Sequence, residues 1–263
     1  MRGYLAILRG SILDSLAYRA GFFFIILGNL LYMCVAYFLW HSIYQNTTTL
    51  RGLTFNETFL YVTLGSTVFV LLKTYADWWI SHEIMDGTIS IYLVRPMDYQ
   101  FYALNISLGF MLVSLMALTV PTFLLLTLVF GVTFPLGPGL LLFPVSLLLA
   151  FLLSFYFDYI TGLFAFYTES IWGISTSKEI LISVLAGALV PLQFFPDAIQ
   201  KVLLVLPFQA IYYTPLMLVT RPNQDWGTLL SMLGVQVFWV VVLFVVTRLF
   251  YHQAIKVLRI AGG

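Results

Sequence analysis

Long stretches of apolar residues, each far longer than a β-strand, run through this sequence. One of them, Phe22–Trp40, continues for 19 residues without a charged side chain. An α-helix needs about 20 apolar residues to cross a lipid bilayer, whereas a membrane β-strand needs about ten. Only 9% of the 263 residues are charged and 61% are hydrophobic, while a soluble domain holds about 25% charged residues. The sequence therefore predicts an all-α integral membrane protein and excludes a soluble fold.

Six transmembrane helices are predicted from these runs. The connections are too short to form a soluble domain, so residues 1–263 are expected to form one transmembrane domain. Lys73 and Asp77, four residues apart near the end of the second span, are expected to pair on one helix. Pro121 predicts a kink in the third span. The predicted spans cover about 22–40, 59–72 with a continuation beyond it, 102–130, 140–166, 180–195 and 229–251.

The N-terminal residues 1–20 form a different kind of segment. Leu5, Leu8, Ile12 and Leu16 recur at helical spacing, with polar residues mostly between them. This pattern is typical of an amphipathic helix that lies in the plane of the membrane interface. We therefore expect an interfacial helix before the first span.

Residues 83–96 concentrate charge and turn signals between two apolar segments. Asp86-Gly87 favours a turn, because glycine adopts positive φ without steric cost. Thr88 then predicts the cap of a short helix, and Arg95-Pro96 its end, because a residue before proline avoids the helical region. Two interpretations remain open from the residues alone: an ordinary solvated loop, or a docking element for a soluble partner.

Residues 196–220 are apolar but broken by Pro196, Pro207 and Pro215. Neither half is long enough to cross a membrane, so we predict a re-entrant or interfacial helical hairpin.

The distribution of basic residues predicts the orientation. With the N-terminus inside, nine Lys and Arg residues are cytoplasmic and three are outside, as the positive-inside rule requires. Both termini are then expected in the cytoplasm. The nine are Arg2, Arg9, Arg19, Lys73, Arg95, Lys178, Arg248, Lys256 and Arg259, and the three are Arg51, Lys201 and Arg221.

No motif for nucleotide or metal chemistry is found. A phosphate-binding loop needs Gly-Lys-Ser/Thr, and no lysine of this chain follows a glycine. The three histidines, His41, His82 and His252, lack metal-ligand spacing. The net charge of +1 does not suggest binding to nucleic acid. We expect no cofactor in this chain.

Ionisable and polar residues within the spans are candidates for a substrate path, because burying them in hydrocarbon is costly. Asp158 is the leading candidate, against the alternative of a hydrated position near the inner headgroups. Asn105 is a second candidate, against simple hydrogen bonding between helices. Phe155 and Tyr159 would line an aromatic path for apolar or cationic molecules, against ordinary packing.

The sequence resembles the membrane-spanning permease subunits of bacterial type-2 ABC exporters along its whole length. Four stretches carry the resemblance: Ala17-Tyr-Arg-Ala20 after the N-terminal helix, the acidic-Gly to Leu-x-Arg-Pro pattern of 83–96, Phe164-Ala-Phe-Tyr-Thr168, and Gly187-Ala-Leu-Val-Pro-Leu-Gln-Phe-Phe-Pro196 followed by Leu206-Pro207-Phe208. The second and fourth are the more specific.

The resemblance implies partners and roles. Such a permease faces a second permease, identical or homologous, within membrane lipid, and the pair docks on two copies of a separate ABC ATPase that holds ATP and Mg²⁺. It implies a location in the bacterial inner membrane. It assigns coupling to the ATPase to Glu83, Asp86, Gly87, Thr88, Ile89, Leu93, Arg95 and Pro96, and an outer hairpin to Pro191, Phe195, Pro196 and Pro207.

The expected function is export of a small amphipathic, drug-like or lipid-like molecule by alternating access, without enzymatic chemistry in this chain. The first alternative is a self-sufficient channel or secondary transporter, which is expected to hold paired charges near the bilayer midplane. The second is an intramembrane enzyme that uses Asp158 and His82 as acid and base.

Overall fold

A computed structural model describes residues 2–17, 19–188 and 190–257. Tyr18 of the N-terminal motif and Arg259 of the basic residues counted above lie outside these ranges. The elements in chain order are α1 (Arg2–Ala17), α2 (Arg19–Tyr44), β1 (Thr49–Leu50), β2 (Leu53–Thr54), α3 (Phe55–Leu72), α4 (Ala76–Met85), α5 (Ile89–Leu93), α6 (Tyr99–Ser114), η1 (Leu115–Thr119), α7 (Val120–Leu128), α8 (Pro138–Leu163), η2 (Phe164–Phe166), α9 (Trp172–Leu185), η3 (Leu192–Phe194), α10 (Asp197–Leu203), η4 (Pro207–Ala210), α11 (Tyr213–Thr220), α12 (Trp226–Ala254) and η5 (Ile255–Val257).

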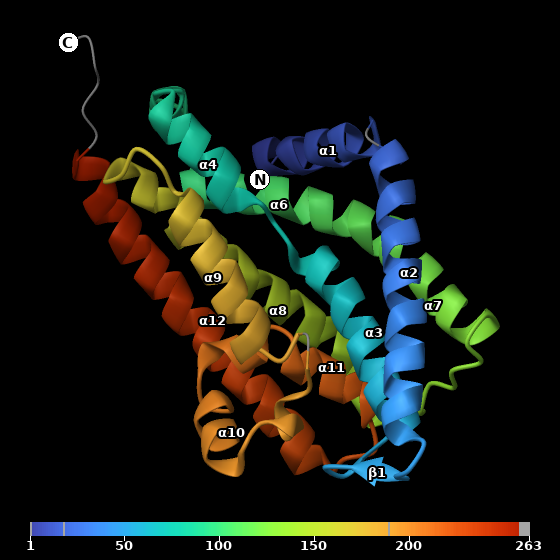
Figure 1. Ribbon diagram of the computed structural model, residues 1–263. Coiled ribbons are helices and arrows are strands. Elements are labelled where there is room, and N and C mark those ends of the chain that lie inside the picture. Colours follow the sequence, from blue (N-terminus) through green and yellow to red (C-terminus); the bar gives the residue numbers. More distant parts are fainter. Residues whose placement is uncertain (1, 18, 189, 258–263) are drawn as a thin grey trace.

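The architecture is a bundle of long helices with short elements at both ends (Figure 1). α1 lies across the upper end beside α6, and α4 projects at that same end. β1 and α10 lie at the opposite end. The two strands form a small antiparallel hairpin in which Leu50 pairs with Leu53. The prediction of an all-helical membrane protein is therefore confirmed at the level of fold class.

Five of the described helical segments are long and apolar enough to cross a membrane. They correspond to predicted spans one, two, three, four and six. The segments are Gly21–Tyr44, Phe55–Met85, Tyr99–Leu128, Pro138–Phe166 and Trp226–Val257.

The fifth predicted span, 180–195, does not form one helix. α9 begins earlier, at Trp172, and its 14 residues end at Leu185. Gly187 then adopts φ +74°, and the N–H groups of Gly187 and Ala188 donate to the carbonyls of Val184 and Ser183. This is a Schellman end, which stops a helix even inside an apolar run. Apolar composition alone did not distinguish a buried irregular segment from a helix, so the six-span count is not confirmed.

The predicted hairpin at 196–220 consists of two short helices, α10 and α11, joined through η4. All eight residues of α11 are buried, and this helix packs against α3 and α8. α10 leaves Ile199 and Val202 exposed. The broken helical character is as predicted, whereas re-entry into the membrane stays a prediction.

The packed core lies where α3, α8 and α11 meet. Phe59 and Tyr61 of α3 and Phe155 of α8 are all 0% exposed. The third predicted span is interrupted by η1, a π-helical turn that ends just before Pro121. This interruption agrees with the predicted kink, because proline cannot donate to the preceding turn.

α1 packs on α6 through a close backbone approach. Ser11 Oγ donates to the carbonyl of Ile106 at 2.6 Å. A Cβ added to Gly109 would lie 2.5 Å from that Oγ, so only glycine fits this contact. Leu5, Leu13 and Leu16 of α1 remain more than half exposed. The helix is confirmed, and its place in the membrane interface stays a prediction.

Candidate functional site

The segment 83–96, predicted as a short helix between two turns, has that arrangement and begins within the preceding helix. Glu83 lies in the last turn of α4, residues 86–88 form a turn, and α5 covers Ile89–Leu93. Gly87 has φ +73°, as the Asp-Gly signal predicted, and the chain leaves the helix before Arg95-Pro96. Thr88 stands at the predicted cap position, but its hydroxyl donates to the carbonyl of Glu83 at 3.2 Å instead. The expected side-chain cap is therefore wrong, because Thr88 has helical backbone angles, φ −64° and ψ −20°, rather than the extended conformation in which a capping hydroxyl reaches the N–H groups ahead of it.

The α4–α5 segment, residues 76–96, buries some of its side chains and exposes others at the tip. Ile89 is 0% exposed and Leu93 is half-buried. Asp86, Gly87, Thr88, Arg95 and Pro96 are all exposed. Three apolar side chains are also exposed: Val94 at 84%, Ile91 at 52% and Met85 at 44%. Several apolar side chains exposed together at one tip mark a candidate surface for contact with a protein or with lipid.

Glu83 fixes the α4–α5 segment to the bundle. Its Oε2 accepts a hydrogen bond of 2.6 Å from the hydroxyl of Tyr99 at the start of α6. The ring of Tyr99 stacks on Tyr251 of α12, with centroids 6.1 Å apart and planes at 12°. It also lies 6.3 Å from the ring of Tyr159 on α8. One carboxylate therefore connects α4 with three other long helices.

A buried ion cluster lies at the base of α4. Lys178 of α9 donates to Asp77 Oδ2 of α4 at 2.7 Å and to Asp158 Oδ1 of α8. Ser175 donates to the same Asp77 oxygen at 2.5 Å, and Thr74 donates to Asp158 Oδ2 at 2.5 Å. We call these five residues the buried ion cluster. A buried charge is tolerated only when it is paired and hydrogen-bonded, as all three charges are here.

Asp158 is thus not isolated. It is 8% exposed and ion-paired with Lys178, within a cluster that joins α4, α8 and α9. The local sequence around Asp158 marked it as a candidate, whereas that around Lys178 indicated only a polar turn, so the ion pair between them was not predicted. The sequence did hold a signal for this pair. A carboxylate inside an apolar span requires a cationic partner, and the chain has few lysines that could supply one.

The predicted pair between Lys73 and Asp77 is wrong. α3 ends at Leu72, and Tyr75 between the two helices has φ +51°, so Lys73 and Asp77 do not lie on one helix. Lys73 Nζ instead donates to Glu179 Oε1 of α9 at 2.6 Å.

The tight approach of α4 to α8 depends on Gly162, where an added Cβ would lie 2.9 Å from Ile80.

The four predicted path residues do not gather at one surface. Phe155 and Tyr159 are 0% exposed and pack against each other in the core, with centroids 5.7 Å apart. Asn105 donates to the carbonyl of Phe101 in its own helix at 2.8 Å. Asp158 borders a cavity, together with residues such as Lys73 and Glu179. A path role is left as a prediction for Asp158, while the observed contacts of the other three are those of packing.

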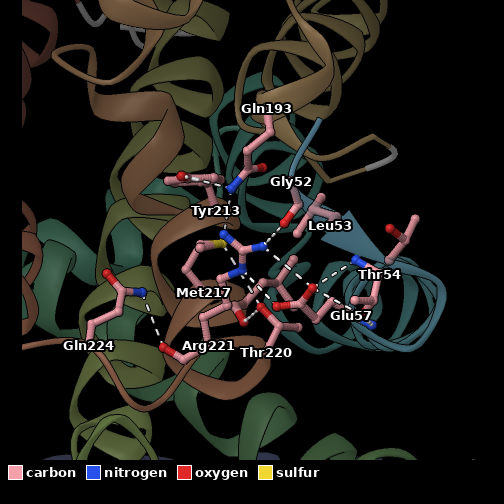
Figure 2. A network of polar contacts seen from close by, with 12 residues as sticks. Gly52, Leu53, Thr54, Glu57, Gln193, Tyr213, Met217, Thr220, Arg221 and Gln224 are labelled. Carbon is pink, nitrogen blue, oxygen red and sulfur yellow. Dashed lines mark hydrogen bonds and ion pairs between the residues drawn. The ribbon is translucent and has the colours of Figure 1, made fainter. Parts of the chain in front are cut away.

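At the opposite end, Arg221 ties the end of α11 to the start of α3 (Figure 2). Its Nε donates to Glu57 Oε1 at 2.8 Å, and one terminal nitrogen donates to the carbonyl of Gly52. Glu57 also accepts from the backbone N–H of Thr54 at 2.8 Å, which completes a capping box on α3. Figure 2 also shows Gln193 of η3, whose Nε2 donates to the hydroxyl of Tyr213 at 3.1 Å.

The residues assigned to the outer hairpin lie along the chain between the end of α9 and the start of η4. Pro191 precedes η3 and is buried, Phe195 follows it and is half-buried, Pro196 precedes α10 and is exposed, and Pro207 opens η4 and is buried. The Gly187 turn before them is held by Tyr61, whose hydroxyl donates to the Gly187 carbonyl at 2.8 Å. An outward location for this region stays a prediction.

Within residues 2–17, 19–188 and 190–257, no three His, Cys, Asp or Glu side chains gather to hold a metal ion. In the described part of the chain, α4 carries a carboxylate anchor, Glu83, and contributes Asp77 to a buried ion cluster that it shares with α8 and α9, and the apolar tip follows it. Residues 30–262 match the family model described as ABC-2 family transporter protein.

The chain belongs to the ABC-2 transporter family. The resemblance stated from the sequence is thereby confirmed over nearly the whole chain. No curated protein matches the sequence significantly. Family membership makes this chain a multi-pass membrane subunit of an ABC transporter and implies an ABC ATPase partner.

As an ABC-2 subunit, the chain is a transport component and not itself a catalyst. The features that the sequence missed are the contacts between distant segments: Lys178 with Asp77 and Asp158, Glu83 with Tyr99, and Arg221 with Glu57. In each contact, the sequence around one residue does not indicate which distant residue it meets.

Proposed function

We propose that this ABC-2 subunit forms the membrane part of an ATP-driven exporter. It moves a small amphipathic, drug-like or lipid-like molecule out of the cytoplasm by alternating access. It works with a second permease, identical or homologous, and with two copies of an ABC ATPase that hold ATP and Mg²⁺. It lies in a bacterial inner membrane with six crossings and both termini in the cytoplasm, an orientation supported by the excess of Lys and Arg on that side.

The single observation that carries the coupling role is the two-sided character of the α4–α5 segment. Its tip exposes Met85, Ile91 and Val94, as a surface that a soluble partner covers would. Behind the tip, Glu83 and Asp77 hold the segment to the bundle through Tyr99 and Lys178. A push on the tip is therefore transmitted to α6, α8, α9 and α12 as movement of rigid elements.

The buried ion cluster supports a division of the bundle into parts that move together. Separating α4 from α8 or α9 would expose Lys178 and two carboxylates to a low-dielectric interior, which is costly. α4, α8 and α9 are therefore expected to shift as one body when the ATPase closes. The hinge would lie at residues 73–75, where Tyr75 has φ +51° and no helical hydrogen-bond ladder continues.

Copurification tests the partner and its docking surface. The tagged chain, extracted from its own cells, is expected to bring down a protein that hydrolyses ATP. Val94→Glu introduces a charge at the exposed tip and is expected to lose that protein. Leu136→Glu is the matched control, because Leu136 is 80% exposed in the loop before α8, at the opposite end of the bundle. Equal recovery of the ATPase with both variants would contradict the docking role.

One observation favours the alternative of a self-sufficient secondary transporter. Such proteins use buried charged groups within the membrane as ion sites, and the buried ion cluster is a group of this kind. Uptake driven by an ion gradient in vesicles without ATP would support that function, and dependence on ATP supports the exporter.

A further inference from the structure

Two cavities of this subunit meet at a pair of shared residues, Phe69 of α3 and Glu179 of α9. The smaller cavity, about 40 Å³, lies against the buried ion cluster. The larger, about 660 Å³, lies between α2, α3 and α9. The second volume lies within the range of cavities that hold small organic ligands.

The larger cavity is lined mostly by apolar side chains. Ile25 of α2, Val70 of α3 and Ile180 of α9 contribute to its wall, with Tyr32 beside them. Asn29, whose amide nitrogen donates to Thr67 and Thr122 at 3.1 Å, is also part of the wall. The other polar lining residues besides Glu179 are Ser66, Thr176 and Ser183. This cavity therefore suits the apolar body of a ligand.

The shared end of the two cavities already holds an ammonium group, that of Lys73. Its Nζ lies 5.6 Å from the ring centroid of Phe69, 5.0 Å from that of Tyr75, and 2.6 Å from Glu179 Oε1. Aromatic faces and a carboxylate are the groups that bind organic ammonium ions. The groups around this ammonium are therefore of the kind that bind an organic cation.

Lys73 and Lys178 differ in how firmly they are held. Lys178 is 15% exposed and ion-paired with two carboxylates, whereas Lys73 is 30% exposed and ion-paired with one, that of Glu179. A partly exposed ion pair with one carboxylate is weak, so a ligand cation that makes the same contacts with Glu179 and the two rings can displace Lys73 toward solvent. The smaller cavity favours a cation over an anion, because Asp77, Asp158 and Glu179 outnumber the two lysines.

We propose that this junction binds an amphipathic organic cation. The ligand's ammonium group takes the place of Lys73 Nζ against Glu179 and the rings of Phe69 and Tyr75, and its apolar body fills the larger cavity. Lys73 is then a tethered occupant that competes with the ligand. The inference rests on the proposed export function, to which it adds a substrate class.

Equilibrium binding to the full chain in lipid nanodiscs tests this proposal with three probes of one shape: 1-aminoadamantane, 1-adamantanol and adamantane-1-carboxylate. The ammonium probe is expected to bind about tenfold tighter than the alcohol, and the carboxylate more weakly than both. Lys73→Met removes the competing ammonium and is expected to raise the affinity for 1-aminoadamantane about two- to fivefold. Lys201→Met, on exposed α10, is the matched control and is expected to change nothing.

Glu179→Gln is expected to abolish the preference for the ammonium probe over the alcohol. Phe69→Leu keeps the Glu179 carboxylate but removes the Phe69 ring, and it is expected to reduce the preference for the ammonium probe over the alcohol. This variant keeps the test available if Glu179→Gln fails to fold. Equal binding of the ammonium and the alcohol by both wild type and Lys73→Met would overturn the proposal, as would a preference that survives Glu179→Gln. These outcomes are independent of ATPase copurification, so a failure here is distinguishable from a failure of the export function.

Discussion

Tyr99 donates a hydrogen bond of 2.6 Å to the carboxylate of Glu83, and this contact joins the start of α6 to the end of α4. Both residues lie just outside the helix α5 that is proposed to meet the ATPase. Because the ring of Tyr99 also stacks on Tyr251, movement of α4 reaches α12 through one side chain. The contact therefore links the end of α4 to both α6 and α12.

Replacing Tyr99 with phenylalanine keeps the ring but removes the hydrogen bond. The loss is expected to cost about 1.5–3 kcal/mol of stability, as for a hydrogen bond to a charged acceptor. It is also expected to lower transport per ATP hydrolysed, because α4 moves without α6. The ratio of transport to ATP hydrolysis in the purified complex measures this.

Tyr44→Phe is the control for that variant. It removes the hydrogen bonds of the Tyr44 hydroxyl with the carbonyl of Leu53 at 3.0 Å and with the hydroxyl of Thr58 at 2.7 Å, near the start of α3. It is expected to lower stability without changing the ratio of transport to hydrolysis. A ratio that falls equally in both variants would assign the effect to general loosening of the bundle.

Lys178→Met leaves Asp77 and Asp158 buried without a counter-ion. Removing one partner of a buried ion pair typically costs about 3–5 kcal/mol. We expect a large drop in Tm for this variant, with partial recovery when Asp77→Asn and Asp158→Asn are added, because the neutral amides no longer require a cation. Thermal unfolding in detergent provides the measurement.

Lys73→Met is the comparison for the buried lysine. The Lys73–Glu179 pair is partly exposed, and pairs of that kind contribute about 0–1 kcal/mol. Its Tm is expected to stay close to that of the wild type. Equal losses from the two lysine substitutions would show that burial of the ion cluster is not what stabilises the α4–α8–α9 contact.

Orientation is tested with single cysteines in a Cys34→Ala background. Thr88 and Leu136 are both exposed in the described chain, and neither makes an ion pair that the change would break. A membrane-impermeant thiol reagent is expected to label Thr88→Cys only in inside-out vesicles and Leu136→Cys only in intact spheroplasts. Labelling of both from one side would reject the proposed topology.

Local signals in the sequence predicted much of the helical framework. Uncharged apolar runs located five of the long helices, and Asp86-Gly87 and Arg95-Pro96 located the turns on either side of α5, because these effects act over a few residues. The end of α9 was missed. The Gly187 turn is buried, so its apolar composition resembles that of a helix.

The polar contacts between distant segments could not be predicted from local sequence patterns. Asp158 and Lys178 are 20 residues apart, and Asp77 and Lys178 are 101 residues apart. Their meeting depends on how α4 packs against α8, which in turn depends on the close approach at Gly162. Nothing within a window of one helix encodes that packing. The same reason explains why Lys73 was assigned the wrong carboxylate.

ATP-dependent transport by the reconstituted complex tests the central claim most directly. The chain and its copurified ATPase are placed in proteoliposomes with the small molecule extracted from the native complex, and accumulation is followed with and without ATP. The account predicts accumulation only when both subunits and ATP are present, with loss of accumulation in Val94→Glu. Accumulation by the chain alone, driven by an ion gradient without ATP, would contradict it.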